Sequence, residues 1–91
     1  MPDEPIELPI NGVLDLHTFD PREVKDLVPD YLAACQARGI LQVRIIHGKG
    51  TGALRRVVWE FLHEHPAVAS CRLGEESEGG DGATVVTLVS N

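Results

Sequence analysis

The chain has 91 residues, which is enough for one small domain with a single hydrophobic core and leaves no room for a second. Its formal net charge of −6 argues against a broad basic surface for duplex nucleic acid. No stretch approaches the roughly 18 apolar residues of a membrane-spanning helix, and the acidic start is unlike a secretory signal, so we expect a cytoplasmic protein that does not associate with membranes.

Residues 1–12 are predicted to form an extended arm, because three prolines there oppose helix formation. The domain itself is expected over residues 13–91. It opens with a strand at residues 13–17, in which apolar and polar side chains alternate. This alternation places Asp15 and His17 on one face, where the carboxylate can orient the imidazole or raise its basicity. The alternative is an Asp and a His that are simply exposed on an uncovered face of the sheet.

A helix is predicted next, from a start at Asp20 to a stop at Gly39. Asp20 can cap this helix, Pro21 suits its first position, and Glu23 completes the spacing of a capping box. Apolar side chains at helical spacing supply a buried stripe. They are Val24, Leu27, Val28, Tyr31, Leu32 and Cys35. Pro29 interrupts this pattern and forfeits one backbone hydrogen bond, which predicts a kink or a local break.

The chain is organised around residues 41–65, which are predicted to form a strand, a glycine-rich turn and a second helix. That helix ends near Pro66, and Trp59 falls beside its apolar stripe, as expected for packing at the edge of the core. The stripe consists of Leu54, Val57, Val58, Phe61 and Leu62. Turn glycines let backbone amides approach a ligand, and the helix behind them presents its positive end, which together suit a phosphate. The glycines can equally serve the geometry of a tight connection.

Two further strands are predicted at residues 68–73 and 83–89, separated by a polar loop. The order is therefore strand, helix, strand, helix, strand, strand. Because parallel strands joined by a helix take a right-handed crossover, two helices should cover one face of a four-stranded mixed sheet. If the first two strands are neighbours, His17 and His47 end at the same edge, where open sheets with helical crossovers bind ligands.

The candidate site comprises a carboxylate, two imidazoles, one ammonium group and three glycines: Asp15, His17, His47, Lys49, Gly48, Gly50 and Gly52. His47 points toward the helices if its strand stays regular, although the turn can re-aim it. Two nucleotide-binding motifs are rejected. The run from Gly48 to Ala53 matches the dinucleotide fingerprint but leaves too little chain for that fold, and the Walker A spacing is absent.

Metal and redox sites have little support in the sequence. Cys35 and Cys71 are not spaced as C-x-x-C and are expected to be buried free thiols. His63 and His65 lie two apart at a helix end, so they cannot chelate one ion. The carboxylates of the loop at residues 74–82 are expected to be solvated. No metal ligands are predicted.

Two motifs, in this order and at this separation, resemble those of the small MutS-related (Smr) domain. The LDLH motif of that family maps onto Leu14, Asp15, Leu16 and His17. Its HGxG motif maps onto His47, Gly48, Lys49 and Gly50. The resemblance runs from about Val13 to Val89 and includes the late run Gly79-Gly80-x-Gly82-x-Thr84.

The resemblance implies a two-layer α/β sandwich of the stand-alone bacterial kind, with nuclease or nucleic-acid-binding activity. The leading hypothesis is an endonuclease that hydrolyses or nicks phosphodiester bonds in DNA or RNA, including messenger RNA on stalled ribosomes. Its catalytic residues would be Asp15, His17 and His47. Its phosphate contacts would be Gly48, Lys49, Gly50, Thr51, Gly52, Arg55 and Arg56.

One position departs from the family pattern. Members commonly place glycine directly after LDLH, and Thr18 stands there in this chain. If that glycine is needed for the close approach of a substrate, Thr18 narrows the site. The alternative hypothesis is a non-catalytic module that binds nucleic acid or a ribonucleoprotein partner through the same edge. A third is a protein-interaction domain that uses the acidic surface. The sequence leaves open the choice of DNA or RNA and the oligomeric state. It also leaves open the cofactor, for which a divalent cation such as magnesium is a candidate.

Overall fold

The computed structural model describes residues 10–16, 19–48, 52–78 and 80–90. Its elements follow in the predicted order. They are β1 (Val13–Asp15), α1 (Pro21–Ala37), β2 (Gln42–Ile46), α2 (Ala53–Glu64), β3 (Val68–Leu73) and β4 (Ala83–Leu88). Two short 3-10 turns, Glu76–Glu78 and Gly80–Gly82, lie between β3 and β4. The arm expected over residues 1–12 falls largely outside the described residues.

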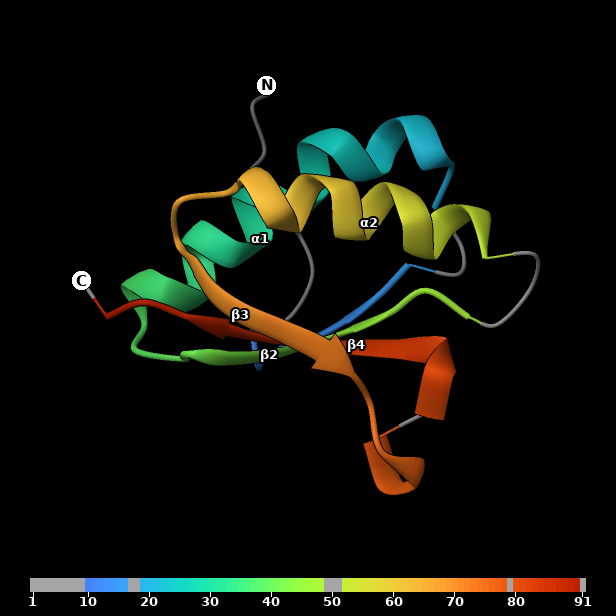
Figure 1. Cartoon of the computed structure of the whole chain (residues 1–91). Coiled ribbons are helices and arrows are strands. Elements are labelled where there is room, and N and C mark those ends of the chain that lie inside the picture. Colours follow the sequence, from blue (N-terminus) through green and yellow to red (C-terminus); the bar gives the residue numbers. More distant parts are fainter. Residues whose placement is uncertain (1–9, 17–18, 49–51, 79, 91) are drawn as a thin grey trace.

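The strands form one mixed sheet in the order β1-β2-β4-β3. β1 and β2 are parallel, whereas β4 pairs antiparallel with both β2 and β3. Figure 1 shows α1 and α2 side by side on one face of this sheet, and neither helix covers the opposite face. The predicted two-layer α/β sandwich, with two helices on one face of a four-stranded mixed sheet, is therefore confirmed.

The hydrophobic core lies between the sheet and the two helices. Leu14 and Leu16 are buried while Val13 and Asp15 are exposed, so the predicted alternation of the first strand is confirmed. From β2 and β4 the core takes alternate residues, Val43, Ile45, Val86 and Leu88. From the helices it takes Val24, Val28, Tyr31, Leu32, Cys35, Val58 and Leu62.

α1 begins with the predicted capping box. The backbone N–H of Arg22 donates to a carboxylate oxygen of Asp20 at 2.8 Å, and the N–H of Asp20 donates to Glu23 at 2.9 Å. These bonds satisfy donors that the first turn of a helix leaves unpaired. The helix then runs unbroken through Pro29. The predicted local break is therefore wrong, because the buried stripe on both sides of Pro29 offsets the one missing hydrogen bond, and a kink stays a prediction.

α1 ends at a glycine, as the sequence predicts. Gly39 has a φ of +77°, and its N–H donates to the carbonyl of Gln36 at 3.1 Å. The N–H of Ile40 donates to the carbonyl of Cys35 at 2.9 Å. This pair of bonds closes the helix in the way that a left-handed residue after its C-terminus allows.

Tyr31 ties α1 to the start of β1. Its hydroxyl accepts from the backbone N–H of Gly12 at 3.2 Å and donates to the carbonyl of Val13 at 3.0 Å. Burial raises the pKa of this phenol. Tyr31, which the sequence places in the apolar stripe of its helix, thus also fixes the position of the edge strand β1.

Both cysteines are free thiols, as expected, but only Cys35 is buried, whereas Cys71 is half-buried at the edge strand β3. Burial raises the pKa of each thiol, which disfavours the reactive thiolate. Within the described ranges no helix is long and apolar enough to cross a membrane.

Candidate functional site

β1 and β2 end side by side because they are parallel neighbours in the sheet. Asp15 lies opposite Ile46, and the backbone N–H of Leu16 donates to the Ile46 carbonyl at 2.8 Å. The first two strands are therefore neighbours, which is the condition under which the sequence predicts a shared edge. His47 directly follows β2, whereas His17 lies outside the described residues.

The end of β2 is fixed by the loop that precedes β4. The backbone N–H groups of His47 and Gly48 both donate to the carbonyl of Gly82, at 3.0 and 2.9 Å. Gly82 is buried at the end of the second 3-10 turn. The loop expected to be solvated thus also bonds, through its last residue, to the first two residues of the HGxG motif, His47 and Gly48.

The imidazole of His47 belongs to a chain of hydrogen bonds. Its Nδ1 lies 3.1 Å from the carbonyl oxygen of Gly48, and its Nε2 lies 2.7 Å from the hydroxyl of Thr84. The same hydroxyl accepts from the indole N–H of Trp59 at 2.8 Å. Because Trp59 belongs to α2, the imidazole points toward the helical layer, as a regular strand predicts.

These partners determine the tautomer of the neutral ring. A carbonyl only accepts, so Nδ1 of His47 must carry the proton that is donated to Gly48. Nε2 then has a lone pair, and the Thr84 hydroxyl must donate to it. We therefore assign the chain Trp59 to Thr84 to His47 to Gly48, in which every donor and acceptor has a partner.

The neutral form of His47 is favoured in the fold. Burial lowers the pKa of this imidazole, which is only 6% exposed, and the nearby Arg55 guanidinium lowers it further. The bond to the Gly48 carbonyl and the Asp81 carboxylate act in the opposite direction. The net effect is a pKa below the ordinary value of 6.5.

The turn into α2 has the backbone that its glycines allow. Gly48 and Gly52 have φ values of +79° and +85°, a region that side chains with a Cβ rarely adopt. Gly52 caps α2, and Arg55 lies close to it, since a Cβ on Gly52 would be 3.5 Å from an Arg55 guanidinium nitrogen. Arg56 is exposed on the same first turn. Three predicted phosphate contacts lie outside the described residues: Lys49, Gly50 and Thr51.

Asp15 and His47 share an edge but not a face. Leu14 and Leu16 point into the core, so Asp15 between them points to the uncovered face of the sheet, where it is exposed. His47 points to the helix-covered face. A substrate that contacts both the HGxG turn and Asp15 must therefore pass over the end of the sheet.

Trp59, Gly82 and Thr84 support the site, a role that the sequence alone did not assign to them, although Gly82 and Thr84 belong to the late run that resembles the family. The sequence predicts that Trp59 packs at the edge of the core, and the side chain is half-buried. Its indole N–H also donates to the Thr84 hydroxyl. A signal for Thr84 was present. It alternates with Val86 on the buried face of β4, and a buried hydroxyl requires a hydrogen-bonding partner.

Metal ligands are not assigned. In the ranges that the structure describes, no three His, Cys, Asp or Glu side chains converge on one point. Mg²⁺ binds through one or two protein carboxylates when substrate phosphates complete its shell, and the exposed Asp15 carboxylate at the edge suits such a partial site.

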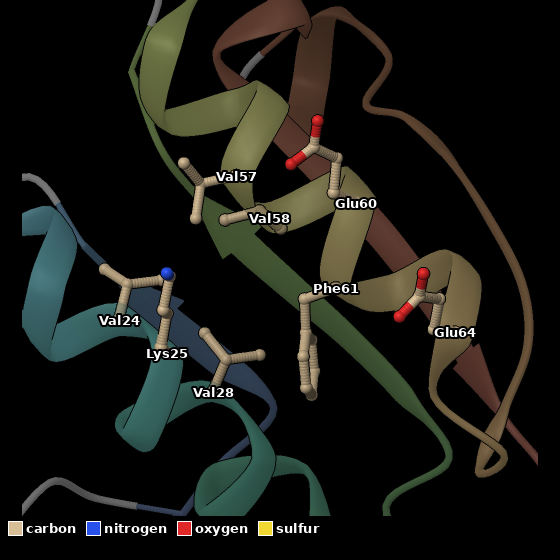
Figure 2. A pocket seen from close by; sticks show the side chains of 8 residues that line it. All are labelled: Val24, Lys25, Val28, Val57, Val58, Glu60, Phe61 and Glu64. Atoms are coloured by element: carbon tan, nitrogen blue, oxygen red, sulfur yellow. The ribbon is translucent and has the colours of Figure 1, made fainter.

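A groove of about 620 Å³ lies between α1 and α2. Figure 2 shows apolar side chains from both helices facing one another across it, with Lys25 on α1 and with Glu60 and Glu64 on α2. The apolar residues are Val24, Val28, Val57, Val58 and Phe61. None of the predicted site residues is among those that line the groove, so it is separate from the candidate site.

Two curated relatives illustrate the sequence similarity. The chain is 43% identical over 78 residues to Endonuclease MutS2 of Carboxydothermus hydrogenoformans, which covers 86% of this chain. It is 45% identical over 75 residues to Endonuclease MutS2 of Clostridium novyi, which covers 82%. In both cases the match spans only 10% of the relative, so the chain corresponds to a small part of those proteins.

Two solved structures share the fold. The Smr domain of Thermus thermophilus MutS2 matches with a TM-score of 0.82 at 37% identity, covering 87% of this chain and 99% of that one. YdaL, a stand-alone small MutS-related protein from Escherichia coli, matches with a TM-score of 0.80 at 29% identity, covering 85% and 63%. The family model described as the Smr domain matches residues 14–89. With the described residues of both motifs at the shared edge of β1 and β2 and this match over most of its length, the chain belongs to the Smr domain family.

Proposed function

We propose that this Smr domain is an endonuclease that cleaves phosphodiester bonds in DNA or RNA at the edge where β1, β2 and α2 meet. The observation that carries the proposal is the turn from β2 into α2. Gly48 and Gly52 take left-handed backbone conformations there, beside the N-terminus of α2 and the Arg55 guanidinium. Backbone donors, a helix dipole and a cation in one place suit a phosphate. The naming of the MutS2 relatives as endonucleases supports the same activity.

The turn and the first turn of α2 would bind and polarise the phosphate group. Preorganised N–H groups and cations stabilise charge that develops on phosphoryl oxygens during cleavage. We assign this role to Lys49, Gly50, Thr51, Gly52, Arg55 and Arg56. The N–H of Gly48 already donates to the Gly82 carbonyl, so Gly48 would contribute the left-handed backbone of the turn. Magnesium is the cation we would include in assays, and no protein ligand is assigned to it.

Of the candidate catalytic residues, we infer that His17 transfers the proton and that Asp15 orients it. The two ring nitrogens of His47 are already bonded to Gly48 and Thr84, and its Nε2 lone pair is engaged. His47 would then act as a positioning residue that holds the HGxG turn. In the alternative, His47 is the general base and the Thr84 hydroxyl turns away when substrate binds.

Cleavage assays test the activity. Labelled single-stranded RNA, single-stranded DNA and supercoiled plasmid would be incubated with the folded protein, with and without magnesium. Wild type should cleave at least one substrate, and Asp15→Asn should slow cleavage by about 10²–10⁴-fold, the usual contribution of acid–base catalysis. Asp26→Asn, which changes an exposed carboxylate on α1, should cleave like wild type. Equal activity in both variants would contradict the role of Asp15.

The pH dependence of the cleavage rate separates the two histidines. If His17 transfers the proton, His17→Ala abolishes the ionisation that limits cleavage, whereas His47→Asn lowers the rate and leaves the shape of the profile unchanged. Loss of the same ionisation in His47→Asn would instead assign proton transfer to His47.

A second candidate is a non-catalytic module that binds nucleic acid or a ribonucleoprotein. It is favoured by Thr18, which stands where family members commonly have glycine and which lies outside the described residues. Binding without cleavage by wild type, together with cleavage by Thr18→Gly, would support it. We propose a cytoplasmic location, where the RNA partner could be bound to ribosomes. Co-sedimentation of the protein with ribosomes would test that association.

A further inference from the structure

The uncovered face of the sheet can be derived from the strand register. Residues paired across neighbouring strands point to the same face. One row on this face runs across all four strands and consists of Val13, Arg44, Val85 and Arg72. The adjacent row is polar and consists of Gln42, Thr87 and Ser70. Two guanidinium groups thus share one face of a chain whose formal net charge is −6.

Arg44 carries a donor without an acceptor. Its Nε is shielded from solvent and has no hydrogen-bond partner among the described residues. The side chain borders a shallow hollow of about 320 Å³, which is also lined by Asn11, Gly12, Val13, Gln42 and Val85. An unpaired polar group of this kind is costly, so a small rotation of the side chain that exposes Nε to an oxyanion is favoured. One oxyanion can then satisfy Nε and a terminal nitrogen of the same guanidinium together. Arg44 is therefore suited to binding a phosphate.

Arg72 extends the positive surface along the same row. It is exposed on β3, and one of its guanidinium nitrogens donates to the carbonyl of Leu73 at 3.1 Å. Val85 separates it from Arg44, so the two arginines are two strand spacings apart, or about 10 Å between backbones. The two rows contain no aromatic side chain for bases to stack on, which favours contacts to the backbone of a nucleic acid.

The face is continuous with the proposed catalytic edge. Asp15 points to it and lies opposite Ile46, two residues after Arg44 on β2. A strand of nucleic acid that reaches Asp15 from the HGxG turn passes over the end of the sheet and arrives beside Arg44.

We propose that the uncovered sheet face is a second nucleic-acid contact surface, on which Arg44 and Arg72 bind backbone phosphates of the strand whose scissile bond lies at the β1–β2 edge. This inference rests on the proposed function, since it takes the substrate of that edge as its ligand. The contacts would be independent of sequence, because they involve phosphates alone.

Binding measured against salt tests the inference. The probes are fluorescently labelled oligothymidylate and oligouridylate of about twenty nucleotides, followed by anisotropy. Arg44→Gln and Arg72→Gln should each weaken binding and reduce the slope of log K against log salt by about 0.7, the value for one phosphate contact on a single strand. The matched control is Arg38→Gln, an exposed arginine at the C-terminal end of α1, which should leave affinity and slope unchanged.

Amide NMR spectra with the same probes give a second readout that does not depend on the variants. Shifts at the backbone amides of Arg44, Val85 and Arg72 would support the inference. Unchanged salt slopes in both variants, or shifts confined to the HGxG turn and α2, would overturn it. Absence of cleavage by wild type would refute the proposed activity alone, since binding is measured separately from cleavage.

Discussion

Thr84 lies between two aromatic side chains whose nitrogens both bond to its hydroxyl. It is fully buried, accepts from Trp59 at 2.8 Å and donates to His47 across 2.7 Å. Thr84→Val keeps the shape of the side chain but leaves both nitrogens without a partner in the interior. We predict that this change lowers the free energy of unfolding by about 1–3 kcal/mol, the usual cost of an unsatisfied buried group, as measured by urea denaturation.

Thr87 provides the matched control on the same strand. It is exposed on the other face of β4, so Thr87→Val should change the free energy of unfolding by no more than about 0.5 kcal/mol. Equal losses in the two variants would mean that the Thr84 hydroxyl contributes nothing beyond the general effect of the substitution.

His47 should make stability depend on pH. Burial lowers its pKa in the folded protein below the ordinary value of 6.5, so the unfolded chain binds a proton more readily than the fold does. The stability that neutral His47 contributes is complete above pH 6.5 and is lost as the pH falls from there toward the folded pKa. Protonation is opposed by Arg55 on α2 and favoured by Asp81 before β4.

Urea denaturation between pH 5 and 8 measures this effect. Wild type should lose stability below pH 6.5 with a slope of at most about 1.4 kcal/mol per pH unit from this one group, and His47→Asn should lack that component. The other histidines are present in both proteins and cancel in the difference. Identical pH profiles for the two proteins would contradict a lowered pKa for His47.

Among the structural elements, those defined by neighbouring residues could be predicted from the sequence. The capping box of α1 joins Asp20 to Glu23, and its C-terminus joins Gly39 to Gln36. Such bonds involve residues within a few positions, so their spacing is visible in the chain. The same holds for the alternation of β1 and for the apolar stripes of both helices.

Contacts between distant elements could not be predicted in this way. The hydroxyl of Thr84 joins side chains that are 25 and 37 positions away, and Gly82 holds the end of β2 through a backbone carbonyl. Gly82 and Thr84 belong to the late run that resembles the family, but nothing in that run shows that the Gly82 carbonyl accepts from the end of β2. The candidate site was therefore predicted at its turn and missed in the residues that support the turn.

Strand register decides which faces the predicted site residues occupy. Asp15 lies opposite Ile46, so it points away from the face on which His47 is buried. A register shifted by one residue would place Asp15 opposite His47 and on the same face, because side chains alternate with a period of two. Sequence patterns predicted that both residues lie at one edge and that a regular strand points His47 toward the helices, but they did not specify the register itself.

For the molecule as a whole, the net charge opposes the ligand that the proposed site would bind. A formal charge of −6 repels a polyanion over distances comparable to the Debye length, about 10 Å at 0.1 M salt. Glu60 and Glu64 are exposed on α2 beside the groove, about one and two helical turns after Arg56. Neither carboxylate is assigned a contact with the ligand, so their charges should act on binding through the electrostatic field.

We predict that the double variant Glu60→Gln, Glu64→Gln binds labelled oligouridylate more tightly than wild type at low salt, with the gain disappearing at high salt. Screening removes a long-range repulsion but leaves short-range contacts largely intact, so the salt dependence identifies the cause. Anisotropy titrations from about 20 mM to 0.5 M salt, which shorten the Debye length from over 20 Å to a few ångströms, provide the measurement. A gain that persists at high salt would instead mean that the two carboxylates lie against the bound strand, which would extend the binding surface from the sheet to the groove beside α2.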